Sequence, residues 1–157
     1  MRNSFLSIII CLVISSCAKN GSIVSEDARI DILKIKFNRN GSNVLRKNGL
    51  DTSAINVQYV TNDIAIDYPY ANVTFPKGYR IVELNGEKIL EVHLCSDKTS
   101  GAKTLLSLVT GRTDTITSNF LKTENVVRYS KVWYNGNLVF DSESDIKIVP
   151  DFIEVEI

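Results

Sequence analysis

The sequence predicts an all-β fold, most simply an antiparallel β-sandwich, with a partly open β-barrel as the alternative. Apolar and polar residues alternate along many short segments, which is the period of a strand that buries one face. Asn-Gly dipeptides, which favour tight hairpin turns, stand between such segments. The connections are too short for crossover helices, so we expect about eight or nine strands in one domain.

The alternation is clearest in residues 33–37 (LKIKF), which place three apolar side chains on one face and two lysines on the other. The same pattern predicts strands in three further segments: 55–59 (INVQY), 63–68 (DIAIDY) and 152–157 (FIEVEI). Their apolar positions are Ile55, Val57 and Tyr59; Ile64, Ile66 and Tyr68; and Ile153, Val155 and Ile157. Helical spacing is not sustained, and only 43–47 or 51–54 suit a short helical turn.

Turn residues divide the chain at regular intervals. Asn85-Gly86 and Asn135-Gly136 have strand patterns on both sides and predict hairpins. The same dipeptide occurs at 40–41 and 48–49, and residues 111–114 (GRTD) predict a further turn.

The composition is that of a globular domain without a strongly charged partner. The 157 residues include 18 basic and 18 acidic side chains, and 44% are hydrophobic. Because the charges balance, no overall field favours nucleic acid or an anionic lipid surface. We therefore expect no nucleic-acid partner.

Residues 1–16 have the layout of a secretory signal peptide. Arg2 gives the start of the chain a positive charge, and residues 5–14 (FLSIIICLVI) form an apolar run. A membrane-spanning helix needs about 20 such residues, so this run is too short to cross a bilayer. Small residues at 15–16 suit a cleavage site.

The run Ile14-Ser15-Ser16-Cys17 resembles the lipobox of bacterial lipoproteins. The resemblance implies that Cys17 carries a thioether-linked diacylglyceryl group, that cleavage occurs before it, and that its amino group is acylated, for example with palmitate. Ala18, in place of aspartate, implies sorting to the outer membrane, and residues 19–22 lack an acidic export signal, which favours the periplasmic face. The alternative is a plain secreted protein in which Cys17 merely follows the cleavage site.

The mature chain is expected to begin with a lipidated tether, residues 17–28, followed by a single sandwich domain, residues 29–157. Cys11 leaves with the signal peptide and Cys17 is lipidated, so Cys95 is left without a disulfide partner. An unpaired thiol in an oxidising compartment is expected to be buried.

His93, the one histidine in the sequence, shares a strand face with Glu91 and Cys95. A Cys–His catalytic pair or a metal site would use these residues, but side chains two apart on a strand lie about 7 Å apart. We favour a polar strand face with one buried thiol. Acidic residues at 63, 67, 141, 143 and 145 are interpreted as solvated strand ends and loops rather than a calcium site. No catalytic residue, metal or cofactor is predicted.

Four aromatic residues are the candidate ligand-binding residues: Tyr68, Tyr70, Trp133 and Tyr134. Exposed rings in these positions would stack on a sugar or contact a protein. Of the four, Trp133 is predicted to lie in the core instead, because a strand buries only one face and tryptophan usually occupies it.

Residues 114–120 (DTITSNF) and 131–140 (KVWYNGNLVF) are similar to the closing hairpins of small, uncharacterised all-β lipoproteins of Bacteroidota. This resemblance implies no catalytic residue. We expect a non-enzymatic, outer-membrane lipoprotein that binds a protein or glycan partner or serves envelope assembly. The alternatives are a carbohydrate-binding accessory of a transport system and a small hydrolase with an unrecognised carboxylate pair. If residues 151–157 form an edge strand, they offer a site for strand addition, although we expect them to pair within their own sheet.

Overall fold

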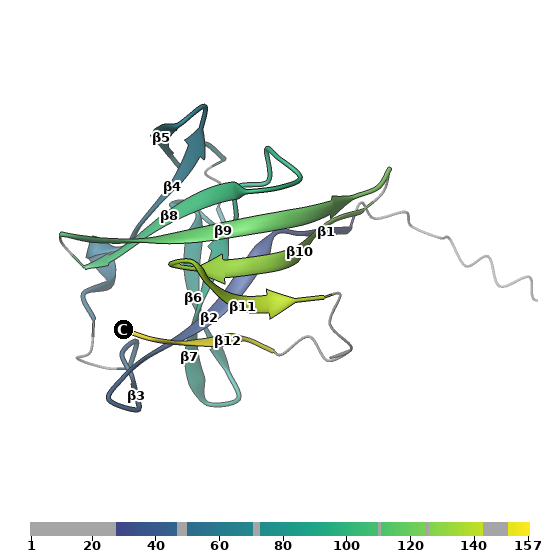
Figure 1. Cartoon of the computed structure of the whole chain (residues 1–157). Coiled ribbons are helices and arrows are strands. Elements are labelled where there is room, and N and C mark those ends of the chain that lie inside the picture. Colours follow the sequence, from purple (N-terminus) through teal and green to yellow (C-terminus); the bar gives the residue numbers. More distant parts are fainter. Residues whose placement is uncertain (1–27, 47–49, 71–72, 110, 125, 143–150) are drawn as a thin grey trace, which may run out of the picture.

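A computed structural model of the chain describes residues 28–46, 50–70, 73–109, 111–124, 126–142 and 151–157 (Figure 1). The predicted signal peptide, Cys17 and the tether before residue 28 lie outside these residues, as do Glu143 and Asp145. Within the described part the chain forms twelve strands and one 3-10 turn, η1 (Thr52–Ala54), and no helix there is long and apolar enough to cross a membrane.

The strands form two sheets. The seven-stranded sheet has the spatial order β1 (Ala28–Ile30), β10 (Val126–Tyr134), β9 (Arg112–Lys122), β8 (Ala102–Val109), β4 (Asn56–Thr61) and β5 (Ile64–Asp67), with β11 (Asn137–Asp141) also beside β10. The five-stranded sheet has the order β12 (Ile153–Glu156), β2 (Ile32–Arg39), β7 (Glu87–His93) and β6 (Tyr79–Leu84), with β3 (Ser42–Asn43) beside β2. In Figure 1, β9 and β10 run across β6 and β7 of the five-stranded sheet. The predicted β-sandwich class is confirmed.

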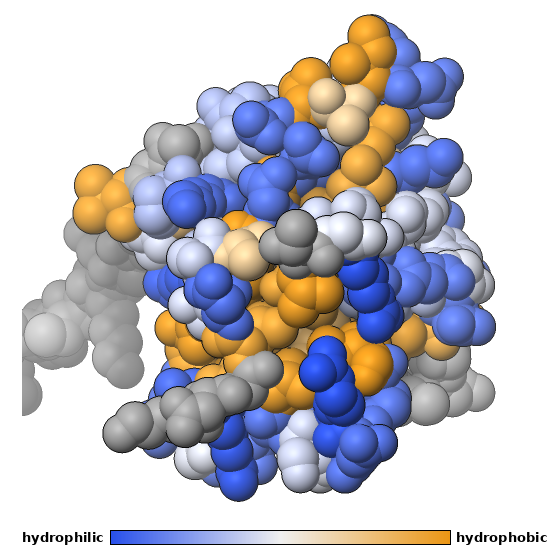
Figure 2. Space-filling view, turned by 90° about the vertical axis from the view of Figure 1, so that its left-hand side faces the viewer, coloured by the Kyte–Doolittle hydropathy of each residue, from blue (hydrophilic) through white to orange (hydrophobic). Residues whose placement is uncertain are grey.

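Apolar side chains from both sheets fill the space between them. From the five-stranded sheet come Leu33, Ile35, Phe37, Leu90 and Val92, and from the seven-stranded sheet Val57, Leu106, Ile116 and Val132. The rings of Phe37 and Tyr134 join the two layers, with their centroids 6.0 Å apart. Figure 2 shows one open end of the sandwich, where apolar side chains form a hollow surrounded by hydrophilic ones.

The predicted alternation is confirmed in three strands. Leu33, Ile35 and Phe37 of β2 are at most 1% exposed, and Val57 and Tyr59 of β4 are likewise buried. In β12, Ile153 and Val155 face the core while the glutamates between and after them are exposed. The short helical turn expected at 51–54 is η1.

Tight turns connect the predicted hairpins. Asn85-Gly86 joins β6 to β7 and Asn135-Gly136 joins β10 to β11, all four residues having positive φ angles between 47° and 82°. Asn40-Gly41 makes the same kind of turn between β2 and β3, whereas residues 48–49 lie outside the described residues. A further turn, Asn62-Asp63, has φ angles of 51° and 62° without a glycine, and it joins β4 to β5.

Strand pairing is antiparallel except at two sheet edges. β1 pairs with β10 in parallel, and β12 pairs with β2 in parallel with Ile153 opposite Ile35. The segment 151–157 therefore pairs within its own sheet, as expected, and β12 is an edge strand. Twelve strands rather than eight or nine are found because short pieces such as β1 and β3 count separately.

A β-bulge in β10 changes which residues face the core. The register against β9 shifts between Tyr129 and Lys131, so Val127 and Tyr129 pack on the core before the bulge, and Val132 and Tyr134 after it. Trp133 lies on the opposite face and is only half-buried, whereas Tyr134 is 4% exposed. The prediction that Trp133 belongs to the core is wrong, because a single inserted residue reverses the alternation.

Candidate binding surface on the β4–β5 hairpin

The β4–β5 hairpin carries apolar side chains that the core does not cover. β5 is the outermost strand of the seven-stranded sheet, and all four of its residues are exposed. Ile64 is 64% and Ile66 39% exposed, and the hairpin stands at the top of the molecule, where Figure 2 also shows apolar side chains at the surface. The sequence pattern for this strand is confirmed, but its apolar side chains lie beyond the part of the sheet that the core covers and are exposed.

Strand register shows which hairpin residues share a face. Ile66 lies opposite Tyr59, and Ile64 lies opposite Thr61. Because directly opposed residues project to the same side of a sheet, these four side chains form one face of the hairpin.

Two tyrosines, Tyr68 and Tyr70, follow the end of β5, and their rings contact each other and that of Tyr59. Tyr70 is 63% exposed, and its ring centroid lies 6.3 Å from that of Tyr59 and 6.1 Å from that of Tyr68. The ring of Tyr70 is tilted by 58° to that of Tyr59 and meets that of Tyr68 edge to face at 82°, so the rings do not form a flat platform. Tyr70 is therefore exposed on one side and supported by two rings on the other.

Tyr59 and Tyr70 border a cavity of about 350 Å³, which we call the hairpin cavity. It is lined by Tyr59, Thr61 and Ile66, by Pro69 and Tyr70, and by residues 95–97 that follow β7. The hydroxyl of Tyr59 donates to the carbonyl of Leu94 at 3.1 Å, which fixes the hairpin to the chain after β7. The volume lies at the lower end of the range for small-ligand sites.

The structure gives His93 and Cys95 separate surroundings instead of joining them in one site. Nδ1 of His93 lies 3.5 Å from the buried carboxylate of Asp31, and its ring centroid lies 4.4 Å from that of Phe75 and 5.6 Å from that of Tyr68. Cys95 is 1% exposed and is part of the core, as expected, and its thiol donates to Asp97 at 3.1 Å. Burial raises the pKa of this thiol to about 11, so it is not an activated nucleophile.

Trp133 and Tyr134 do not belong to the hairpin surface. Both are on β10, separated from β5 by β9, β8 and β4. The hydroxyl of Tyr134 donates to the buried carboxylate of Asp114 at 2.7 Å, and burial together with this hydrogen bond raises its pKa well above the usual value. Of the four candidate ligand-binding residues, the structure brings only Tyr68 and Tyr70 together.

Of the predicted acidic residues that the structure describes, Asp67 and Asp141 each pair with a different neighbour. Asp67 accepts a hydrogen bond from Gln58 at 3.0 Å, and Asp141 pairs with Lys131 at 3.4 Å. Across the residues that the structure describes, no group of three or more His, Cys, Asp or Glu side chains is placed to hold a metal ion.

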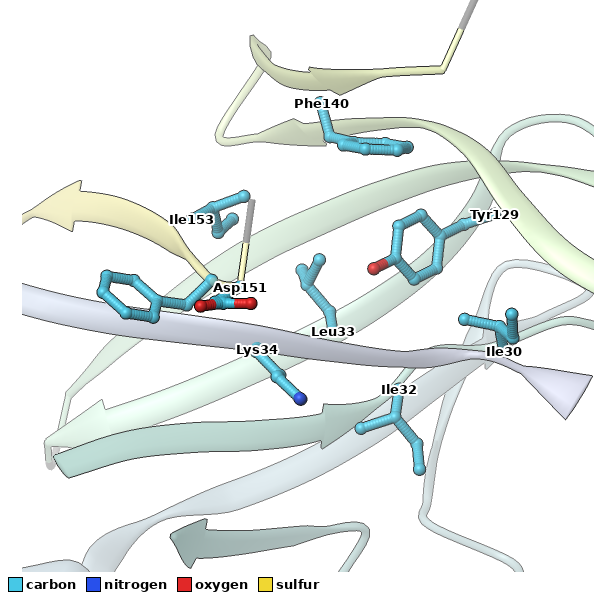
Figure 3. A pocket seen from close by; sticks show the side chains of 9 residues that line it. Ile30, Ile32, Leu33, Lys34, Tyr129, Phe140, Asp151 and Ile153 are labelled. Atoms are coloured by element: carbon cyan, nitrogen blue, oxygen red, sulfur yellow. The ribbon is translucent and has the colours of Figure 1, made fainter. Parts of the chain in front are cut away.

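A second cavity, of about 240 Å³, opens between the two sheets at β2, β10, β11 and β12 (Figure 3). Tyr129 and Phe140 project into it, with their ring centroids 5.1 Å apart, and Leu33 and Ile153 lie opposite them. Residues 143–150 connect two of its walls and lie outside the described residues, so we assign no role to this cavity.

Sequence reasoning did not identify Asp97, Asp31 or Asp114 as site residues. Each acquires its role from a neighbour brought close by the fold, as Asp31 does from His93 and Asp114 from Tyr134. A search of protein families, curated proteins and solved structures finds no match to this chain.

Proposed function

We propose that this protein is a bacterial outer-membrane lipoprotein, held at the periplasmic face by acyl chains on Cys17, whose β-sandwich domain binds another component of the envelope. The proposal begins from the sequence Ile14-Ser15-Ser16-Cys17, which resembles a lipobox and follows an apolar run too short to span a membrane. Two or more acyl chains give stable anchoring, because one chain alone binds a bilayer only marginally.

The placement of β1 and β5 carries the binding part of the proposal. The two strands are the opposite edges of the seven-stranded sheet, and the chain continues from β1 toward Cys17. A domain held through β1 presents the far edge, β5, away from its attachment point. That edge carries Ile64, Ile66 and, just beyond it, Tyr70, which are all exposed. An exposed apolar edge strand is costly to keep unless it serves recognition.

The domain is proposed to act without a chemical step of its own. The two residues most suited to catalysis by type are already engaged: His93 contacts both Phe75 and Asp31, and Cys95 is buried with a raised pKa. A binding role uses the side chains that the surface does offer, which are apolar and aromatic.

Lipidation is tested on protein isolated from its native host. The intact mass is expected to equal residues 17–157 plus a diacylglyceryl group and an amide-linked acyl chain. The variant Cys17→Ser is expected to remain uncleaved and unlipidated. A freely released wild-type protein with an unmodified thiol at residue 17 would overturn the anchoring proposal.

Binding is tested by placing a photoreactive amino acid at position 64 and irradiating intact cells. We expect a discrete cross-linked product from position 64 and none from position 138 on β11, where the leucine is 54% exposed and serves as a matched surface control. Equal products from both positions, or none from position 64, would contradict binding through the hairpin.

A further inference from the structure

The hairpin cavity combines an apolar wall with a polar one. The side chains of Tyr59, Ile66 and Tyr70 form the first, and Thr61, Ser96 and Asp97 contribute the second. A pyranose ring has the same division, because its C–H groups gather on its faces and its hydroxyl groups project from its edge. We propose that this cavity binds one neutral sugar ring.

Tyr70 is the ring on which the sugar would stack. It is 63% exposed, and the neighbouring rings of Tyr59 and Tyr68 support it from behind. The ring of Tyr68 packs directly against the backbone of Gly78. A Cβ added to Gly78 would lie only 2.6 Å from Cγ of Tyr68. Support of this kind lowers the entropy lost when a surface side chain is fixed by a ligand.

Asp97 supplies acceptors for the sugar hydroxyl groups. One carboxylate oxygen accepts the Cys95 thiol at 3.1 Å and the other accepts the Thr61 hydroxyl at 3.4 Å, which orients the group. Each carboxylate oxygen has a second lone pair for a hydroxyl donor. Two neighbouring sugar hydroxyl groups can therefore bind to one carboxylate.

The charges around the cavity favour a neutral ligand over an ionic one. Lys122 donates to the carbonyl of Ser96 at 2.6 Å, and Lys98 is close enough to stabilise the Cys95 thiolate. Two positive charges beside Ser96 and Cys95 reduce the negative potential at the polar wall and so weaken attraction for a cation, while Asp97 itself opposes an anion there. The size of the cavity, about 350 Å³, suits one ring better than an extended chain.

This inference rests on the proposed binding function and names its ligand class. The test uses the mature lipoprotein in lipid nanodiscs, with saturation-transfer NMR and calorimetry. The probes are the methyl glycosides of glucose, galactose, mannose and N-acetylglucosamine, together with choline and glucuronate as charged comparisons. We expect binding by at least one neutral glycoside and weaker binding by both ions.

Variants locate the bound sugar. Tyr70→Ala is expected to lower the affinity about tenfold, because the stacking surface is lost, while Tyr70→Phe retains it. Asp97→Asn is expected to lower the affinity for the sugar by a similar factor. Leu138→Ser is the surface control, and its affinity is expected to be unchanged. Absence of binding by every neutral glycoside, tighter binding of choline, or an unchanged affinity in Tyr70→Ala would each overturn the sugar proposal. The cross-link at position 64 and the mass of the anchored protein are measured separately, so the proposed function can hold where the sugar proposal fails.

Discussion

The ring of Tyr68 occupies the space that a side chain at Gly78 would need. A Cβ built on Gly78 lies 2.6 Å from Cγ and 2.8 Å from Cδ2 of Tyr68, and Gly78 has a φ of 75°. Two separate constraints thus require glycine at this position: a left-handed backbone and contact with a ring. Since Tyr68 supports Tyr70, the glycine also helps to shape the proposed binding surface.

Gly78→Ala is expected to lower the free energy of unfolding by about 2–4 kcal/mol, measured by urea denaturation. Gly86→Ala is the matched control, because Gly86 has nearly the same φ, 76°, but nothing within 4 Å of the added Cβ. Gly86→Ala is expected to lower the free energy of unfolding by about 1–2 kcal/mol, because only the backbone strain contributes. Equal losses in the two variants would show that contact with Tyr68 is unimportant.

Tyr134→Phe is expected to cost about 1–3 kcal/mol, because the buried carboxylate of Asp114 loses its hydrogen bond from the phenol. Asp114 still accepts hydrogen bonds from Asn135 at 2.8 Å and from Arg112 at 3.2 Å, which limits the loss of stability. Trp133→Phe, on the outer face of the same strand, is expected to cost less. The comparison is made by thermal and urea unfolding at neutral pH.

Ionisation of Tyr134 is expected to destabilise the folded protein at alkaline pH. The pKa of Tyr134 is raised in the folded state, by burial first and by Asp114 second, so the folded protein favours the neutral phenol. The stabilisation is complete below the usual tyrosine pKa of about 10 and is lost as the pH rises above it. Unfolding measured between pH 9 and 12 should show a steeper loss in the wild type than in Tyr134→Phe. Parallel curves would contradict this assignment.

Cys95 is expected to resist thiol reagents in the folded protein. It is 1% exposed and its pKa is raised to about 11, so little thiolate is present at pH 8. Ellman's reagent should react at the rate of global unfolding and rapidly in denaturant. Fast reaction without denaturant would contradict the buried placement.

Ile64→Lys is expected to change the free energy of unfolding by less than about 0.5 kcal/mol, because the side chain is already 64% exposed. Ile35→Ala, at a fully buried position of β2, is expected to cost about 2–5 kcal/mol. The lysine is also expected to reduce self-association in concentrated solution, measured by light scattering, since a charge on an edge strand blocks strand addition. A large loss of stability in Ile64→Lys would show that the hairpin packs against the domain.

Much of the fold follows from local sequence patterns. The burial of Leu33, Ile35 and Phe37 and the turns at Asn85-Gly86 and Asn135-Gly136 depend on neighbouring residues alone, and they were predictable for that reason. The exposure of Ile64 and Ile66 could not be predicted in this way. Alternation shows that two side chains share a face of a strand, but it does not show what covers that face.

The features missed are those that arise between distant parts of the chain. The bulge at Tyr129–Lys131 exchanges the faces of Trp133 and Tyr134, and it is defined by pairing with β9. The same holds for the site residues: Tyr70 was a candidate from its type, whereas Asp97 joins it only because the fold brings residues 95–97 to the same cavity.

Joining β12 to β2 has a consequence for the order of assembly. Lys36 and Glu154, which are hydrogen-bonded across this pair, are separated by 118 positions in the chain. The flank of β2 that β12 covers stays bare until β12 itself has been synthesised, and closing so long a loop is slow. Completion of the smaller sheet is thus a late event, and a product truncated before β12 would present an unsatisfied strand to any neighbour.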